Sequence, residues 1–263
     1  MKTPHTLAIS SFAVNGTASL KTFIAVLGER ILPVPSIILN GLTNMSLVKK
    51  FDSPFRELLQ SSFELAVNRD LDLILYIGYL GKAEQAEIIL EMIGKYRKNI
   101  KTIITDPVCG DHGRAYVPDE IIAQWPQIIG LSDMVFPNLT EIKMLTGNPP
   151  GDDQASHVYI EEFKKRFPRP LLVLTSVQPD EDNIGLEVHG ATSFSYFNDK
   201  LSKNYGGSGD AFVSLFILNR FYKQMDLNVA LKVAADKTYQ LIKNSIKNGS
   251  DDLLLSLPES PII

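Results

Sequence analysis

Short apolar runs alternate along the chain with segments whose apolar residues recur at helical spacing. Continuous apolar runs are typical of strands covered on both faces, and helical recurrence is typical of amphipathic helices. The pattern predicts strands at residues 6–9, 31–39, 71–77, 102–105, 134–136 and 171–174, with a hairpin at 184–188 and 193–197. It predicts helices at residues 20–27, 55–63, 88–93, 210–222 and 227–246.

Glycine, serine and proline residues indicate where several of these elements begin or end. Gly28 follows the first helical segment as a C-cap, and Ser53 with Pro54 gives the next helix an N-cap and a proline in its first turn. Pro33 and Pro35 have no N–H to donate to a sheet ladder. The second strand is therefore expected at an edge of the sheet or at a bend.

Alternating strands and helices predict a single α/β domain that spans residues 1–263. Such chains form three layers, with a mainly parallel central sheet and helices on both faces. Ligands bind these sheets beyond the carboxyl ends of the strands. The polar and small residues at the predicted strand ends are Ser10, Ser11, Gly78, Tyr79, Asp106, Asn138, Thr175 and Ser176. We therefore expect the functional site where these strand ends meet.

Composition and charge narrow the classes of function. Hydrophobic residues make up 44% of the chain, which is enough for a large core, and the net charge of -4 comes without the basic stripe of a nucleic-acid-binding protein. No apolar run approaches the roughly 20 residues that cross a bilayer, and no signal peptide is expected at the start. A single cysteine, Cys109, excludes a disulfide framework within the chain. We expect a soluble, cytoplasmic protein that binds neither nucleic acid nor membrane.

The segment Gly206-Gly207-Ser208-Gly209-Asp210 is the most informative stretch of the sequence. Small residues let backbone amides approach a ligand, and the helix that begins there offers unpaired N–H groups and the positive end of its dipole. The segment therefore predicts an anion site. Asp210 has two interpretations, as a helix cap or as a general base beside a phosphoryl group. The Lys-Ser/Thr ending of a P-loop is missing, so that mechanism is not supported.

A second segment, residues 106–113, follows a strand and contains the carboxylates of Asp106 and Asp111. Carboxylates at a strand end suit Mg²⁺, and Glu141 would add a third. The alternative is an ordinary loop with Asx turns, and Asn138 with Glu141 also has the spacing of a helix capping box. Both interpretations stay open from the residues alone.

Several segments together resemble the pyridoxal kinase group of the ribokinase-like superfamily. The segments are residues 7–11, residues 16–28, Gly78-Tyr79-Leu80-Gly81, Asp106-Pro107-Val108-Cys109-Gly110-Asp111, Pro137-Asn138-Leu139-Thr140-Glu141 and Gly207-Ser208-Gly209-Asp210. They resemble the first strand and helix of these kinases and their Gly-Tyr-Leu-Gly, Asp-Pro-Val-x-Gly-Asp, Pro-Asn-x-x-Glu and Gly-Thr/Ser-Gly-Asp segments. The resemblance spans nearly the whole chain in order and implies a three-layer ribokinase-like fold.

The resemblance implies ATP-dependent phosphorylation of the 5′-hydroxymethyl group of pyridoxal, pyridoxine or pyridoxamine. Asp210 would take the hydroxyl proton, and the amides of Gly207, Ser208 and Gly209 would hold the transferred phosphoryl group. The implied contacts are Asp106, Asn138, Glu141, Thr175 and Ser176 for the nucleotide, Ser11, Thr43, Tyr79 and Tyr116 for the vitamer, and Asp111 and Glu141 for Mg²⁺. Residues 109–116 would act as a lid that excludes water.

The sequence departs from this family at three places. Residues 40–43 read Asn-Gly-Leu-Thr where many pyridoxal kinases have a histidine before the threonine, so the preferred vitamer stays open. Phe136 stands where a threonine often lies near a monovalent cation, so a potassium requirement also stays open. Ser208 replaces the commoner threonine, which leaves the backbone amide in place.

Other functions remain compatible with the sequence. A hydroxymethylpyrimidine or sugar kinase would use the same base, and a catalytically silent homologue would bind nucleotide or pyridoxal phosphate without turnover. Tyr79, Leu42 and Phe12 favour an aromatic acceptor over a sugar, and Asp210 favours an active enzyme. Cys109 is either a small buried residue or a thiol that adds to an aldehyde. The resemblance also implies a homodimer.

Overall fold

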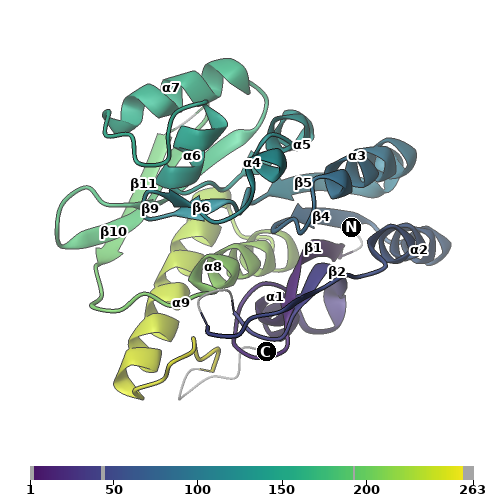
Figure 1. Ribbon diagram of the computed structural model, residues 1–263, viewed down its shortest axis with the longest axis horizontal. Helices are drawn as coiled ribbons and strands as arrows, with labels where there is room; N and C mark the ends of the chain where they lie inside the picture. Colours follow the sequence, from purple (N-terminus) through teal and green to yellow (C-terminus); the bar gives the residue numbers. More distant parts are fainter. Residues whose placement is uncertain (1–2, 43–44, 192, 257–263) are drawn as a thin grey trace.

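The computed structural model describes residues 3–42, 45–191 and 193–256, and nine of its strands form one sheet (Figure 1). These strands are β1 (His5–Ala13), β2 (Ile31–Leu39), β3 (Lys50–Phe51), β4 (Leu73–Ile77), β5 (Ile100–Thr105), β8 (Met134–Val135), β9 (Leu171–Val177), β10 (Asn183–His189) and β11 (Ser193–Asp199). Their order is β11-β10-β9-β8-β5-β4-β1-β2-β3, and the pairs between β9 and β2 are parallel. The predicted mainly parallel sheet is confirmed.

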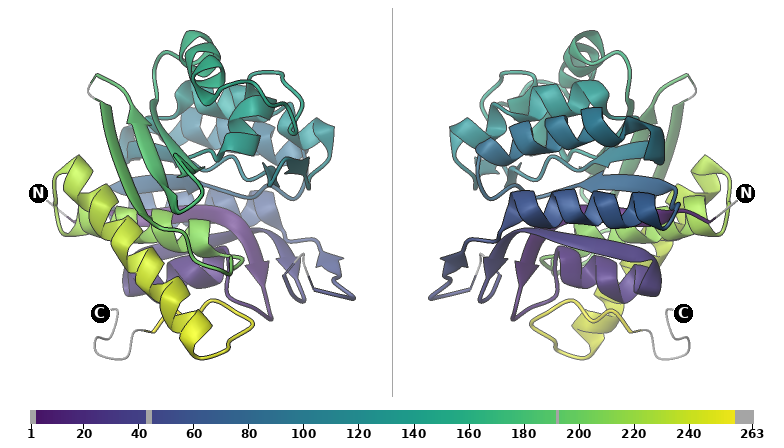
Figure 2. Two further views of the ribbon diagram at one scale, coloured as in Figure 1. Left: turned by 90° about the vertical axis from the view of Figure 1, so that its left-hand side faces the viewer. Right: turned by 90° about the vertical axis from the view of Figure 1, so that its right-hand side faces the viewer.

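Helices cover both faces of this sheet (Figure 2). One face carries α1 (Leu20–Leu27), α8 (Ser208–Ile217) and α9 (Leu227–Lys247). The other face carries α2 (Phe55–Asn68), α3 (Glu84–Tyr96), α4 (Asp119–Ile122), α5 (Trp125–Leu131), α6 (Leu139–Leu145) and α7 (Ser156–Arg166). Each face has its own apolar core, so the three-layer prediction holds.

The central strand β4 shows why its sequence is almost wholly apolar. Leu75 and Ile77 pack into the core on the α2 and α3 face, whereas Ile74 and Tyr76 pack into the core on the α1 and α8 face. All of these side chains are buried. Alternate residues of a strand point to opposite faces, so a strand covered on both sides must be apolar throughout.

The edge predicted from the two prolines is confirmed, but the predicted cap of α2 is wrong. In the described part of the chain, β3 is the one strand on the outer side of β2, and it pairs only with Ile38 and Leu39. Pro54 occupies the N-cap position of α2, and the hydroxyl of Ser53 donates to the carbonyl of Pro35 at 2.6 Å. The hydroxyl expected to cap the helix therefore bonds to a carbonyl of β2 instead.

Other differences concern where elements end. The strands β1 and β9 run further than predicted and contain Ser11 and Thr175. The predicted helix 210–222 consists of α8 and a π-helical segment, Leu218–Tyr222. Helices α4, α5 and α7 were not predicted, because α4 and α5 are short and α7 has only a narrow apolar stripe on a polar surface. No helix of the described ranges is both long and apolar enough to cross a membrane.

Candidate active site

Residues 207–210, at the start of α8, present a group of backbone N–H donors that we call the cradle. Gly207 is the N-cap residue of α8 and is left-handed, with φ at 85°. A Cβ at this position would collide with the carbonyl oxygen of Thr17, so the close approach of the two segments requires glycine. Within the described residues, the N–H groups of Gly209 and Asp210 have no acceptor. They lie at the positive end of the helix dipole, which suits an anion.

Asp210 lies in the first turn of α8 and is not its cap, because Gly207 holds that position. The backbone N–H of Ser19 donates to Oδ2 of Asp210 at 2.8 Å. Burial raises the pKa of the Asp210 carboxyl to about 6, and the hydrogen bond from Ser19 opposes part of that rise. A carboxylate with a pKa near neutrality and limited hydration is suited to accept a proton.

Ser19 directs its N–H to the carboxylate through an unusual backbone conformation. Its φ is 51° and its ψ is −134°, a region that residues with a Cβ seldom occupy. Such conformations cost about 1–3 kcal/mol each and cluster at functional sites. The hydroxyl of Ser11 donates to the Ser19 hydroxyl at 2.8 Å. Ser11, which was expected to contact the vitamer, therefore lies one hydrogen bond away from the residue that holds Asp210.

Asp106 stands at the carboxyl end of β5 and is buried. The hydroxyl of Tyr76 donates to its Oδ2 at 3.3 Å. Burial, and then the negative charge of Asp210, raise the pKa of Asp106 to about 8. The structure has therefore brought together two carboxylates that are far apart in the sequence, Asp106 from a strand end and Asp210 from a helix start.

The capping box at the start of α6 is confirmed. The N–H of Glu141 donates to Oδ1 of Asn138 at 3.0 Å, and the N–H of Asn138 donates to Oε2 of Glu141 at 2.9 Å. The other oxygen of Glu141, Oε1, accepts the N–H of Cys109 at 3.1 Å. Burial, and then the charge of Asp106, raise the pKa of Glu141 well above its usual range. Each oxygen of this predicted Mg²⁺ ligand thus already accepts one N–H group.

The loop after β5 is fastened to α6. It contains a small hairpin of β6 (Gly110–Asp111) and β7 (Arg114–Ala115). The Asn138 side chain donates to the carbonyl of Gly110 at 2.8 Å, and the N–H of Gly113 donates to the Thr140 hydroxyl at 2.9 Å. The inner part of the expected lid is therefore held in place.

The outer part of this loop is exposed. Asp111, the other predicted Mg²⁺ ligand, accepts the N–H of His112 at 2.8 Å and has an exposed carboxylate. Tyr116 is 49% exposed. Cys109 is wholly buried, and burial raises the pKa of its thiol, so it fits the interpretation as a small buried residue.

Two predicted nucleotide contacts lie beside the start of α6. Thr175 on β9 forms an isolated bridge with Asn138, and its hydroxyl donates to the carbonyl of Pro137 at 3.2 Å. Ser176 is exposed and left-handed, with φ at 57°. Both residues lie toward the carboxyl end of β9.

The predicted vitamer contacts are less tightly grouped. Tyr79 is buried, and Nζ of Lys50 donates to its hydroxyl at 3.4 Å. Thr43 lies outside the described residues. Its neighbour Leu42 borders a cavity of about 330 Å³ that also touches Gly206, next to the cradle.

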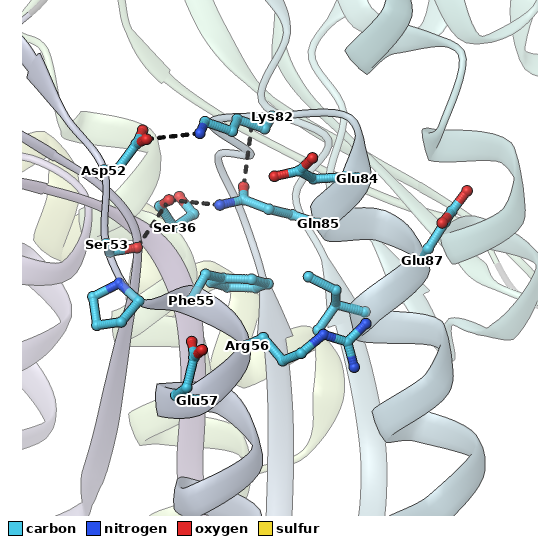
Figure 3. Close-up of a pocket in the computed structure, with 12 residues that line it drawn as sticks. Ser36, Asp52, Ser53, Phe55, Arg56, Glu57, Lys82, Glu84, Gln85 and Glu87 are labelled. Atoms are coloured by element: carbon cyan, nitrogen blue, oxygen red, sulfur yellow. Dashed lines mark hydrogen bonds and ion pairs between the residues drawn. The ribbon is translucent and has the colours of Figure 1, made fainter.

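A larger cavity, of about 430 Å³, lies between the N-terminal ends of α2 and α3 (Figure 3). Gln85 points toward Ser36 and donates to its carbonyl at 2.6 Å, and Lys82 forms an ion pair with Asp52. None of the residues predicted for the site lines this cavity. It is separate from the cradle.

Sequence reasoning missed Tyr76 and Ser19. Tyr76 could have been identified from the sequence, because a hydroxyl in a strand covered on both faces needs a buried hydrogen-bond partner. Ser19 could not have been identified in this way, because its role depends on its backbone N–H and on a conformation imposed by packing.

Curated relatives match part of the chain. Pyridoxal kinase of Dictyostelium discoideum is 26% identical over 183 residues, which cover 64% of this chain and 60% of that protein. Pyridoxal kinase of Arabidopsis thaliana is 31% identical over 156 residues, which cover 55% of this chain and 49% of that protein. The chain thus spans about half to three fifths of the length of these relatives.

Solved structures match almost the whole chain. Pyridoxal kinase of Entamoeba histolytica superposes with a TM-score of 0.84 at 20% identity, covering 97% of this chain and 93% of that one. Pyridoxal kinase of Leishmania donovani in complex with ADP and pyridoxamine has a TM-score of 0.81 at 20% identity, with coverages of 95% and 90%. These likenesses show the fold, and the predicted ribokinase-like architecture is confirmed. The family model described as phosphomethylpyrimidine kinase matches residues 18–255, and the chain therefore belongs to that family.

Proposed function

We propose that this chain transfers the γ-phosphoryl group of ATP to the 5′-hydroxymethyl group of pyridoxal, pyridoxine or pyridoxamine. The observation that carries the proposal is the position of Asp210, a buried carboxylate held by Ser19 beside the free N–H groups of the α8 cradle. The relatives named pyridoxal kinase, and the related structure with ADP and pyridoxamine, support this choice of substrates.

In this proposal Asp210 is the general base. The Ser19 N–H engages Oδ2, so Oδ1 is available to the hydroxyl of the acceptor. A pKa of about 6 keeps the carboxylate ionised at neutral pH, yet leaves it basic enough to take a proton as the new P–O bond forms. The deprotonated oxygen then attacks the γ-phosphorus of ATP in line with the leaving ADP.

The cradle stabilises the transferred group. The N–H groups of Gly209 and Asp210 lie in the first turn of α8, where negative charge is favoured, whereas the N–H of Ser208 donates to the carbonyl of Tyr205 at 3.3 Å. Fixed donors aimed at the charge that develops on the phosphoryl oxygens lower the barrier without reorganisation. The left-handed Gly207 lets this turn approach the segment at Thr17.

The acidic residues beyond the cradle suit Mg²⁺. The donors are carboxylate oxygens of Asp106, Asp111 and Glu141, the type that Mg²⁺ prefers. In the described part of the chain, no three acidic, histidine or cysteine side chains gather closely enough to hold an ion by themselves. Asp111 and Glu141 would therefore hold Mg²⁺ together with the nucleotide phosphates, whose charge the ion would neutralise.

Two other elements of the proposal follow from the loops. The expected lid is anchored to α6 through Gly110 and Gly113, so any closure over the substrate would involve the exposed side chains of this hairpin, such as Asp111 and Tyr116. Phe136 is buried against Phe212 and Phe216 and offers no oxygen to a monovalent cation. Measuring the activity with and without potassium tests whether a monovalent cation is needed.

A hydroxymethylpyrimidine kinase is the second candidate, because the description of the family model names a phosphomethylpyrimidine, which is the phosphorylated form of that alcohol. Both acceptors are flat nitrogen heterocycles with a primary alcohol, so the same base and cradle serve either one. A panel of pyridoxal, pyridoxine, pyridoxamine, hydroxymethylpyrimidine and ribose with Mg²⁺ and ATP separates them. We expect ADP formation with the vitamers. Phosphorylation of the pyrimidine or of ribose alone would overturn the proposal, and no turnover would favour a silent homologue.

A homodimeric, cytoplasmic protein completes the proposal. The single cysteine of the chain is consistent with a reducing compartment. Light scattering of the purified protein is expected to give twice the mass of 29.2 kDa. A monomer mass at micromolar concentration would contradict the dimer.

A further inference from the structure

Tyr76 is a buried phenol that the proposed chemistry does not use. It lies on β4, has no exposed surface, and its ring packs against Phe23 with 4.2 Å between the ring centroids. An aliphatic or phenyl side chain would fill the same space. A buried hydroxyl is unfavourable unless it is hydrogen-bonded, so the presence of the oxygen needs its own explanation.

The hydroxyl lies at the carboxyl end of the sheet, among the acidic side chains. It donates to Oδ2 of Asp106 at 3.3 Å, and it is so near the backbone of Gly78 that a Cβ there would come within 2.8 Å of it. The negative charges of Asp106, Asp210 and Glu141 all act on the phenol. Burial and these charges raise the pKa of Tyr76 well above its usual range, so the group stays a neutral donor.

The three carboxylates differ in the donors that hold them. Glu141 accepts two backbone N–H groups, and Asp210 accepts the N–H of Ser19. For the carboxylate of Asp106, the Tyr76 hydroxyl is the one donor found among the described residues. The orientation of Asp106 therefore depends on a single side chain, whereas the other two depend on the backbone.

We propose that Tyr76 is a positioning residue of the phosphoryl-transfer site, whose hydroxyl fixes the Asp106 carboxylate between Asp210 and Glu141. The inference rests on the proposed function, because it assumes turnover at this site. A carboxylate released from this contact turns within a buried space that the base and the nucleotide phosphates share. Such misplacement slows the chemical step and leaves the outer binding contacts intact.

The test compares two tyrosines that make the same kind of bond. Tyr76→Phe removes the hydroxyl at the site. Tyr159→Phe removes the hydroxyl of an equally buried tyrosine on α7, which donates to Asp152 at 2.7 Å. We expect Tyr76→Phe to lower kcat roughly 10- to 100-fold, the range of a hydrogen bond to a carboxylate, with KM for ATP and for the vitamer changed less than threefold. The Tyr159→Phe variant is expected to keep the wild-type kcat.

Other outcomes would overturn the inference. A kcat within twofold of wild type in Tyr76→Phe, an effect on KM alone, or an equal loss in Tyr159→Phe would each do so. Where Tyr76→Phe fails to fold, Asp106→Ala removes the acceptor of the same contact and is expected to lower kcat at least tenfold, and a wild-type kcat in that variant would overturn the inference. A wild-type protein that phosphorylates only another alcohol of the panel ends the vitamer proposal but leaves this comparison valid with that alcohol. Failure to phosphorylate any alcohol overturns both.

Discussion

The backbone N–H of Ser19 donates to Oδ2 of Asp210 across 191 positions of sequence. The contact joins the start of α1 to the first turn of α8, next to the place where Gly207 packs against the carbonyl of Thr17. The side chain that we propose as the base is thus oriented by a main-chain group. A main-chain donor keeps its place as long as the two helix ends stay together.

Ser19→Gly is expected to stabilise the protein and to preserve activity. The left-handed φ of 51° strains a residue with a Cβ but not a glycine, and the N–H group that holds Asp210 is retained. The free energy of unfolding should rise by about 1 kcal/mol, with kcat within threefold of wild type. Urea unfolding and steady-state kinetics measure both quantities. A large loss of kcat would instead assign the role to the Ser19 hydroxyl and its contact with Ser11.

Asp210→Asn is expected to abolish turnover and to leave nucleotide binding unchanged. The amide has the same shape but cannot take the proton of the acceptor, and general-base catalysis contributes roughly 100- to 10,000-fold. The rate of ADP formation checks the first expectation, and calorimetric titration with ADP checks the second. Wild-type activity in this variant would remove the assignment of the base.

The pH dependence of kcat/KM should show an acidic limb near pH 6. Burial raises the pKa of Asp210 to about 6, and only the ionised carboxylate accepts a proton. Activity should therefore fall about tenfold for each pH unit below that value and level off above it. A profile that stays flat down to pH 5 would contradict this assignment.

The fold could be predicted because its signals are local. The strand β4 is apolar at nearly every position, and the C-cap expected at Gly28 is present. The cap expected at Ser53 failed because the same hydroxyl suits a carbonyl at the sheet edge equally well. Local chemistry identifies a donor, but tertiary structure decides which acceptor it reaches.

The site was predictable only in part, for a related reason. Strand ends identified Asp106, and helix-start chemistry identified Gly207 and Asp210, because both features follow from the chain itself. The roles of Ser19 and Tyr76 depend on contacts between distant segments. No spacing in the sequence encodes a backbone N–H aimed at a remote carboxylate.

Asp106→Asn is expected to stabilise the free protein above neutral pH while impairing activity. The folded-state pKa of Asp106 is raised to about 8, so the folded state favours the protonated form. The stability linked to this group is complete below the unfolded pKa near 4 and is lost as the pH rises toward 8. Asparagine cannot ionise, so the variant should gain on the order of 5 kcal/mol at pH 8, at about 1.4 kcal/mol for each unit of pKa. Urea unfolding at pH 4 and at pH 8 measures this difference, which should be small at pH 4.

Gly209→Ala tests whether the cradle binds a ligand in a variant that is expected to fold normally. Among the described residues, nothing beyond its own helical turn lies within 4 Å of the position that a Cβ at Gly209 would take, and alanine is the better helix former by about 1 kcal/mol. The variant should therefore fold at least as stably as wild type. We nevertheless expect kcat/KM to fall at least tenfold, because the added methyl group occupies the space in which the phosphoryl group approaches the amides. Thermal unfolding measures the stability of the variant, and steady-state kinetics measure its kcat/KM. Gly207→Ala is the contrast, since its Cβ meets the backbone of Thr17 and should destabilise the fold itself. Unchanged kinetics in Gly209→Ala would show that no ligand comes close to this turn.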